Sequence, residues 1–361
     1  LQNKSDDIIA IPYRLQASAA TTPAVTKTND SGLLLLNHAG ALVTVVGTPP
    51  REGDAAYGGG GIFGQFSGRA VCSVLQWAQF EAFFIPDTGR PVAAVWETRA
   101  DGAVDKNLMV KAGDTAVGVV PATATFSSFP GISQANGFSL YRARLKGAPA
   151  SANEGIWRSF VGLLVAKGAD LTSAGLPGVR IGSIVRFWPV NSVGNQVVVQ
   201  VTLTGTGVTA ANRSALLLRQ NDGNYLLLLR TGDRAPGAGP ATVLAIQAVD
   251  VNPGSGHYAV LGSLKGAKSS DNQALWAGRT ALGVDGISTF MRLPSLRLRK
   301  GERYLSTVTP LGTIKGLSLK PAVDPTGAGG RGLAQVVGSG GHIAVGILTD
   351  GGVTEQVLLG P

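Results

Sequence analysis

The chain of 361 residues has few of the residue types on which several common folds and sites depend. Its single cysteine, Cys72, excludes a disulfide scaffold and a zinc site built from cysteines. Charged residues make up only 15% of the chain and hydrophobic residues 44%, which excludes both a disordered chain and a coiled coil. No uninterrupted apolar run reaches the roughly 18 residues of a membrane span, so we expect no transmembrane segment. In no window of about 11 or more residues do the apolar residues recur with a helical period. This absence favours an all-β fold.

Basic residues outnumber acidic ones, with 31 Lys and Arg against 22 Asp and Glu and a formal net charge of +9. This balance favours anionic partners, although most basic residues are scattered as on an ordinary solvated surface. Two leucines, Leu296 and Leu298, alternate with arginines in the densest cluster, which predicts a strand with one apolar and one cationic face. No aromatic ladder accompanies it, so we do not expect nucleic acid to bind there. The basic cluster comprises Arg292, Arg297, Arg299, Lys300 and Arg303.

A short motif with a basic residue, a glycine and then an acidic residue recurs along the chain at intervals of roughly 60 residues. Glycine tolerates unusual φ angles, and a carboxylate can cap a turn by accepting bonds from nearby N–H groups. Each motif supplies one carboxylate, whereas calcium needs several oxygen ligands, so we interpret the acidic residues as structural. These turn residues are Asp54, Asp114, Asp170, Asp233 and Glu302.

Other turn signals run in phase with this motif and separate short apolar runs. The clearest hairpin signals are Asn221–Asn224, which contains an Asp-Gly pair, and Asp350–Gly352. Each repeat therefore predicts four short strands, as in a propeller blade. We predict one β-propeller of about six four-stranded blades; five blades, seven blades or a stacked β-sandwich are the alternatives. The predicted blades are 1–50, 51–115, 116–171, 172–236, 237–303 and 304–361.

The first predicted blade has no opening strand, because Ile8–Leu15 already has the pattern of a second strand. Either an upstream strand has been removed or another segment completes that blade. The chain begins at Leu1 and shows no basic-then-apolar leader, so we expect a processed or truncated N-terminus.

The repeat markers resemble a tandem-repeat family of bacterial exported proteins, whose repeats carry an N-x-x-G-x-x-A-F-like strand and a G-D-x-A-P-G turn. Residues 232–237 match this turn fully, while Gly113–Ala116 and Gly53–Ala56 match it in part. The A-F pair of the strand motif is mostly replaced by Val-Val, Ala-Val or Ser-Leu. The resemblance covers most of the chain and implies an exported protein in the periplasm or at the cell surface. It implies no catalytic residues.

Residues that would catalyse a reaction or hold a metal form no recognisable constellation. We interpret His38, His257 and His342 as turn and strand residues, because their positions within the repeats differ and no ligand lies at metal spacing. Asp250 stands just before an Asn-Pro-Gly turn and is interpreted as its cap. Trp157 and Trp276 occupy equivalent repeat positions, which favours packing between blades over sugar binding. We predict no catalytic residue, no cofactor and no metal.

The leading hypothesis is a non-enzymatic, exported β-propeller that serves as a protein-binding or structural subunit of a larger envelope assembly. Its basic cluster is the first candidate contact for an acidic protein partner. The alternative is a polysaccharide-active enzyme, a glycoside hydrolase or lyase with carboxylates in a central pocket, or a carbohydrate-binding propeller.

Overall fold

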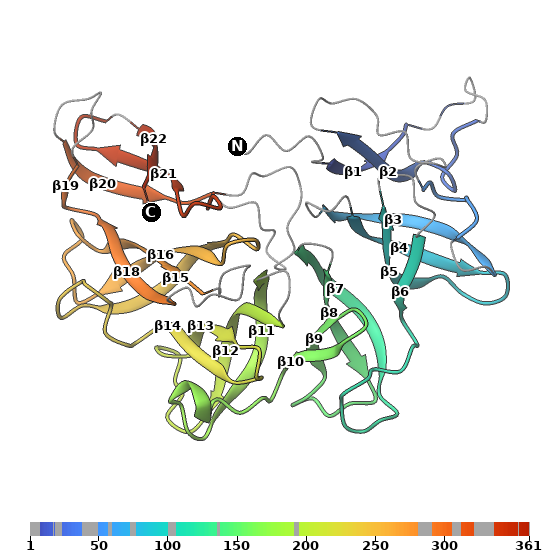
Figure 1. The fold of residues 1–361 in the computed structure, drawn as a ribbon, viewed down its shortest axis with the longest axis horizontal. Coiled ribbons are helices and arrows are strands. Elements are labelled where there is room, and N and C mark those ends of the chain that lie inside the picture. Colours follow the sequence, from blue (N-terminus) through green and yellow to red (C-terminus); the bar gives the residue numbers. More distant parts are fainter. Residues whose placement is uncertain are drawn as a thin grey trace. The chain divides into compact units, whose positions relative to one another are not determined.

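The regular secondary structure of the computed structural model is almost entirely antiparallel β-sheet (Figure 1). The structure describes residues 8–16, 18, 24–37, 50–56, 60–72, 77–99, 106–135, 138–190, 195–280, 291–304, 312–320, 336–352 and 354–360. Within these ranges the one helical element is the 3-10 turn η1 (Thr172–Ala174). None of the described helical structure is long and apolar enough to cross a membrane. The prediction of an all-β chain is confirmed.

The strands form six successive sheets in chain order. The first sheet has two strands, β1 (Ile8–Arg14) and β2 (Ser31–Asn37). The second sheet consists of β3 (Gly61–Cys72), β4 (Trp77–Pro86), β5 (Val92–Arg99) and β6 (Lys106–Lys111). The third consists of β7 (Thr125–Ala135), β8 (Phe138–Lys146), β9 (Glu154–Arg158) and β10 (Gly162–Ala166). The fourth sheet consists of β11 (Val179–Val190), β12 (Gln196–Gly205), β13 (Ser214–Arg219) and β14 (Tyr225–Arg230). The fifth consists of β15 (Thr242–Val251), β16 (His257–Lys265), β17 (Gln273–Arg279) and β18 (Arg292–Arg299). The sixth is β19 (Arg303–Tyr304), β20 (Gly312–Ser318), β21 (Ile343–Thr349) and β22 (Thr354–Leu359). The prediction of about six blade-like sheets is confirmed.

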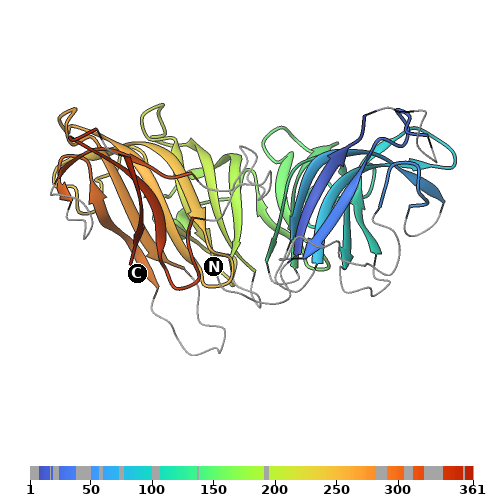
Figure 2. The ribbon, with the colours of Figure 1, turned by 90° about the horizontal axis from the view of Figure 1, so that it is seen from above.

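By its internal contacts the chain divides into two compact units. The first is Leu1–Lys167 with Asp324–Arg331, and the second is Gly168–Val323 with Gly332–Pro361. Within each unit the strands of neighbouring sheets run alongside one another (Figure 2). The first unit contains the first three sheets and the second unit the last three.

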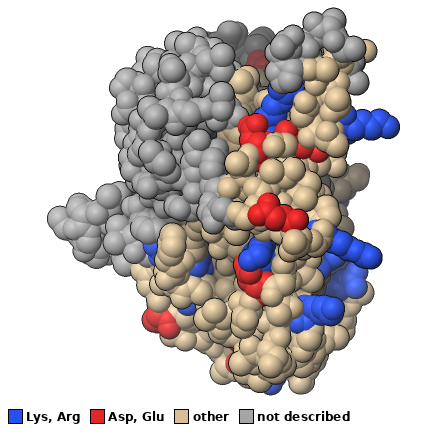
Figure 3. Space-filling model, turned by 90° about the vertical axis from the view of Figure 1, so that its right-hand side faces the viewer, with Lys and Arg blue, Asp and Glu red and all other residues tan. Residues whose placement is uncertain are grey.

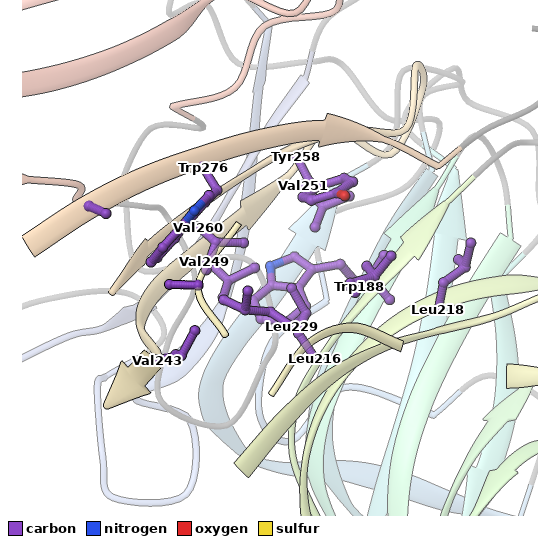
Figure 4. Packing of buried hydrophobic residues seen from close by; sticks show 14 of the residues in the cluster. Trp188, Leu216, Leu218, Leu229, Val243, Val249, Val251, Tyr258, Val260 and Trp276 are labelled. Carbon is purple, nitrogen blue, oxygen red and sulfur yellow. The ribbon is translucent and has the colours of Figure 1, made fainter. Parts of the chain in front are cut away.

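Apolar side chains fill the space between neighbouring sheets of each unit. Figure 4 shows one such layer, where Trp188 of β11, Leu216 of β13 and Trp276 of β17 meet between the fourth and fifth sheets. In the first unit, Phe126, Tyr141 and Trp157 pack between the second and third sheets, with Phe126 edge-on to Trp157 at 5.0 Å between ring centroids. Burial of both faces of a sheet explains why these strands are continuous apolar runs.

The recurring glycine turn joins one sheet to the next by the same hydrogen bonds at each junction. The glycine N–H donates to a carbonyl in the strand that follows, at 2.7–2.9 Å. These bonds are Gly53 to Phe63, Gly113 to Phe126, Gly168 to Ile181, Gly232 to Val243 and Gly301 to Ile314. All five glycines have φ between 84° and 98°, where a side chain would be strained. The strands that open a repeat are therefore β3, β7, β11, β15 and β20.

This pattern corrects the predicted alignment of the third turn. The sequence pattern aligned Asp170 with Asp114, but Gly168 makes the bond that Gly113 makes, so Ala169 occupies the position of Asp114. Asp170 instead forms the isolated bridge to Arg180 that Thr115 forms to Thr125. The third repeat has an acidic residue one position later than the others.

The two terminal sheets lack different members of the repeat. The residue before each turn glycine donates its N–H to a third strand, and in the first junction Glu52 donates to Ser31 at 2.8 Å. This makes β2 a third strand and β1 a second strand, as the pattern of Ile8–Leu15 predicts. In the sixth sheet Val345 pairs with Val357, just as Val260 pairs with Trp276 of β17. The last strand, β22, is therefore a third strand.

Candidate protein-binding surface

The predicted basic cluster lies on and after β18, the last strand of the fifth sheet. Arg292 and Arg303 are exposed. Arg299 forms an ion pair with Asp271 at 2.9 Å, and the Lys300 ammonium donates to the Ser269 carbonyl at 2.6 Å. Arg297 donates from Nη2 to the Gly360 carbonyl at 2.6 Å. The cluster therefore combines exposed cations with arginine and lysine side chains that hold neighbouring turns.

The prediction that β18 has one apolar and one cationic face is wrong. Leu298 pairs with Leu275, whereas Leu296 pairs with Trp276, because a bulge interrupts the register between them. Adjacent strand residues point to opposite faces, and a bulge changes which face a residue occupies. Leu296 therefore packs against the layer between the fourth and fifth sheets, and Leu298 against the layer of the fifth and sixth.

Large apolar side chains are exposed on the same strand and on its neighbour. Met291 and Leu293, at the start of β18, are 41% and 55% exposed. Leu358, on β22, is 67% exposed. The contact of Arg297 with Gly360 places the end of β22 next to β18, as Figure 1 also shows. We use the name β18–β22 surface for the exposed residues Met291, Arg292, Leu293 and Arg303 around β18 and for the exposed Leu358 of β22. Leu358 points away from the fifth sheet, because its neighbours Val357 and Leu359 pack against the layer between the fifth and sixth sheets.

Strand β22 is also the edge of its sheet among the described residues. Third strands elsewhere are enclosed: all five residues of β9 are buried, and so are four of the six in β13. No residue of β22 is buried, and its side chains alternate between exposed and intermediate. Strand β22 therefore occupies the third position of the repeat, which is mostly buried in β9 and β13, although its own side chains are exposed or partly exposed.

The acidic turn residues have structural contacts. Asp54 and Asp114 each accept the N–H of the residue three positions earlier at 2.9 Å, and Glu302 accepts that of Arg299 at 3.1 Å. These are the capping bonds that the pattern predicts. Asp170 accepts the N–H of Thr172 instead, and the side chain of Asp233 is partly buried, which raises its pKa against the opposing charge of Arg230.

The histidines show a second correction. His257 and His342 occupy equivalent positions, because the N–H groups of Asn252 and Gly338 donate to their carbonyls in the same way. Burial lowers the pKa of His257, and the charge of Arg279 acts in the same direction. His38 lies outside the described residues. Among those described, no three His, Cys, Asp or Glu side chains are grouped closely enough to hold a metal ion.

Asp250 does not have the predicted role. Asn252 caps the turn, accepting the N–H groups of Gly254 and Ser255 at 3.1 and 3.0 Å. The Asp250 carboxylate, 2% exposed, accepts the N–H groups of Val336 and Val337 at 2.8 and 2.9 Å. It fastens the segment before β21 to the fifth sheet, because it reaches across the interface between sheets.

A second buried carboxylate was not foreseen from the sequence. Glu97 is 4% exposed and accepts bonds from Ser139 Oγ at 2.6 Å and Gln134 Nε2 at 3.0 Å, between the second and third sheets. Burial raises the pKa of Glu97, and these two hydrogen bonds partly oppose that shift. Glu97 and Asp250 belong to different units and different sheets. In the described part of the chain, the hydrogen bonds to these two carboxylates come from hydroxyl, amide and backbone N–H groups and not from a second carboxylic acid.

A pocket of about 350 Å³ lies in the first unit beside the hairpin between β9 and β10. Its walls include Val117, Phe160 and Val161, with the carboxylate of Asp114 at one side. Phe160 is 93% exposed and has φ of 62°, a conformation that costs a non-glycine residue about 1–2 kcal/mol. An exposed aromatic ring held there is a second feature that the sequence pattern did not indicate.

The matching family model is the Family of unknown function (DUF7453), over residues 49–283. The chain belongs to this family. A search of the curated proteins finds no match.

The DUF7453 match contains the first four glycine turns, the pocket and both buried carboxylates. The β18–β22 surface lies beyond residue 283, outside the matched region. On the face shown in Figure 3, basic and acidic side chains are interspersed among mostly uncharged residues. Among the described residues, β18 and β22 together carry exposed cations, exposed large apolar side chains and a sheet edge.

Proposed function

We propose that the chain is a non-enzymatic β-propeller that binds another protein through the β18–β22 surface. The observations that support the proposal are the exposed Arg292 and Arg303, the exposed Leu358, and the position of β22 at the edge of its sheet among the described residues. Apolar groups provide contact area, and surrounding cations select an acidic partner and accelerate its association. An exported location within an envelope assembly belongs to the same proposal and depends on the repeat motifs alone.

The proposal is tested by isolating the unchanged protein and two charge-reversal variants, each under mild conditions from the native source. The double variant Arg292→Glu/Arg303→Glu should lose a stoichiometric partner that the unchanged chain retains at low salt. The matched control is Arg180→Glu/Arg213→Glu, which reverses two exposed arginines of the same unit away from this surface. Loss of the partner with both variants, or from neither, would contradict docking at the β18–β22 surface.

Carbohydrate binding is the second candidate function, and the pocket beside Phe160 is the observation that favours it. An exposed ring can stack on a sugar face, and the Asp114 carboxylate and the Thr115 hydroxyl are hydrogen-bonding groups in the same pocket. Titration of a monosaccharide panel into the protein and into a Phe160→Ser variant tests it. Equal heats with both proteins would remove the pocket as the sugar site.

A further inference from the structure

The pocket beside Phe160 is lined mostly by apolar side chains. The buried rings of Phe126, Tyr141 and Trp157 form part of its wall. The exposed Phe160 and Val161, in the hairpin between β9 and β10, lie at its rim. Small-molecule sites are mostly apolar cavities of this size, in which a few polar groups orient the ligand.

Two polar groups of this pocket lie close to each other. Burial raises the pKa of Tyr141, and the nearby negative charge of Asp114 raises it further. Tyr141 is 7% exposed, and its hydroxyl has no hydrogen-bond partner among the described residues. Buried hydroxyl groups in proteins are normally hydrogen-bonded. This one therefore indicates that a polar group of a ligand fits beside Tyr141 and Asp114.

Among the described lining residues, the charge that faces the pocket is that of the Asp114 carboxylate. Arg158 also borders the pocket, but it follows Trp157 in β9, and adjacent strand residues point to opposite faces. Its side chain therefore points away from the face that carries Tyr141 and Trp157. The Lys111 ammonium pairs with Asp114 Oδ1 at 2.8 Å, and both side chains are more than a third exposed. Such an exposed pair contributes little, so a second ammonium group can displace Lys111.

Phe160 is held at the rim in a strained backbone conformation. Its φ of 62° lies in the left-handed region, which residues with a side chain seldom adopt. Strain of this kind is concentrated at ligand sites, where the surrounding structure maintains it. The face of an aromatic ring packs against apolar groups and attracts cations. An exposed ring near a carboxylate therefore matches a ligand with an apolar body and a positive charge.

We infer that this pocket binds a small ligand that carries an ammonium group on an apolar body. The ammonium group donates hydrogen bonds to the Asp114 carboxylate and the Tyr141 hydroxyl, and the apolar body packs on Phe160 and Val161. The inference rests on the second candidate function for the position of the site, and it adds the charge of the ligand. An amino sugar with a free ammonium group satisfies both, whereas Asp114 repels an anionic sugar.

Two pairs of probes test the charge of the ligand. Cyclohexylammonium and cyclohexanol share one ring and differ in the ammonium group, and glucosamine and N-acetylglucosamine differ in the same way on a sugar ring. Binding to the whole protein is measured by isothermal titration calorimetry at low salt, where charges are screened least. We expect each ammonium probe to bind about tenfold more tightly than its neutral counterpart. Equal affinities within both pairs would overturn the inference.

Three variants locate the binding. Asp114→Asn keeps an oxygen that can cap the turn and removes the charge, so it should weaken cyclohexylammonium about tenfold and leave cyclohexanol unchanged. Asp54→Asn is the matched control, because Asp54 makes the same capping bond in the preceding turn and lies outside this pocket. Lys111→Met removes the competing ammonium group and should strengthen cyclohexylammonium several-fold. Binding that Asp114→Asn leaves unchanged, or that Lys111→Met weakens, would overturn the inference.

The remaining outcomes separate the inference from the proposed functions. If N-acetylglucosamine binds as tightly as glucosamine and Phe160→Ser weakens both, the charge assignment is overturned and the carbohydrate candidate is kept. If none of the four probes binds, the inference is overturned, and the monosaccharide panel decides whether the carbohydrate candidate is also removed. Protein binding at the β18–β22 surface is tested separately by the arginine variants.

Discussion

The indole Nε1 of Trp276 donates a hydrogen bond of 2.8 Å to the carbonyl oxygen of Pro236. Trp157 donates in the same way to Val117 at 3.0 Å, and both tryptophans are almost completely buried. Pro236 and Val117 each lie four residues after the turn glycine, so the glycine turn of one sheet is fastened to the third strand of the next. In these two repeats the tryptophan therefore links two sheets, whereas the equivalent Trp96 donates to the Ala82 carbonyl of its own sheet at 3.2 Å.

Removing the indole N–H should weaken this link between sheets. In Trp276→Phe the Pro236 carbonyl loses its donor, and an unsatisfied buried acceptor costs about 1–3 kcal/mol. We expect the unfolding free energy to fall by that amount, measured by urea denaturation. Trp157→Phe should act similarly, because its bond is equivalent. A change below about 0.5 kcal/mol in both variants would show that the bond has little weight.

The turn glycines should tolerate substitution according to their surroundings. A Cβ on Gly232, where φ is 84°, would lie 2.9 Å from Asn212 Cβ. Gly239 also has a positive φ, of 69°, but a Cβ there would meet nothing within 4 Å. Gly239→Ala should therefore lose about 1–2 kcal/mol through backbone strain alone. Gly232→Ala should lose a further 1 kcal/mol or so through overpacking, and equal losses by thermal denaturation would contradict this reading.

Much of the fold follows from the sequence because its turns have local chemical signals. The Asp-Gly hairpin is one example: Asp222 accepts the N–H of Asn224 at 2.9 Å, and Gly223 has φ of 90°. Such contacts involve residues two or three positions apart, so the pattern alone predicts them. The alternation of apolar residues predicts the strands for the same reason.

Contacts between sheets could not be predicted in this way. The carboxylate of Asp250 accepts its hydrogen bonds from a segment about 86 residues further along the chain. Residues so far apart in the sequence leave no local sequence pattern that would predict the contact. The bulge at Arg297 turns Leu296 and Leu298 to opposite faces, although the alternating pattern is unchanged. The one-residue shift of Asp170 and the equivalence of His257 with His342 emerge from backbone hydrogen bonds, which a sequence pattern does not contain.

Asp250 should be necessary for fastening the segment before β21. Asp250→Ala leaves two N–H groups, those of Val336 and Val337, without their acceptor, at a cost of about 2 kcal/mol or more. Asp250→Asn should lose less stability, because the asparagine keeps an acceptor oxygen. It also removes a charge that burial disfavours, since burial raises the pKa of Asp250. Urea denaturation gives both losses, and hydrogen exchange at the amide of Val337 gives the local one. Equal losses in the two variants would argue against the hydrogen bonds as the cause.

The charge of Glu97 should lower stability at neutral pH. Its pKa is higher in the folded chain than in the unfolded one, because burial disfavours the ionised form more than Ser139 and Gln134 stabilise it. The folded state therefore binds the proton more tightly. The resulting stability is fully present below the unfolded pKa and is lost as pH rises through the folded pKa.

Glu97→Gln removes this dependence, since glutamine stays uncharged while its amide oxygen still accepts hydrogen bonds. Relative to the unchanged chain, the variant should become more stable between pH 4 and pH 7, as measured by urea denaturation at each pH. Ser139→Ala removes a bond of 2.6 Å to the carboxylate and should make the total loss of stability with rising pH larger in the chain that retains Glu97. If Glu97→Gln instead loses stability relative to the unchanged chain as pH rises, the carboxylate is stabilised by its surroundings and the buried layer around it is adapted to a negative charge.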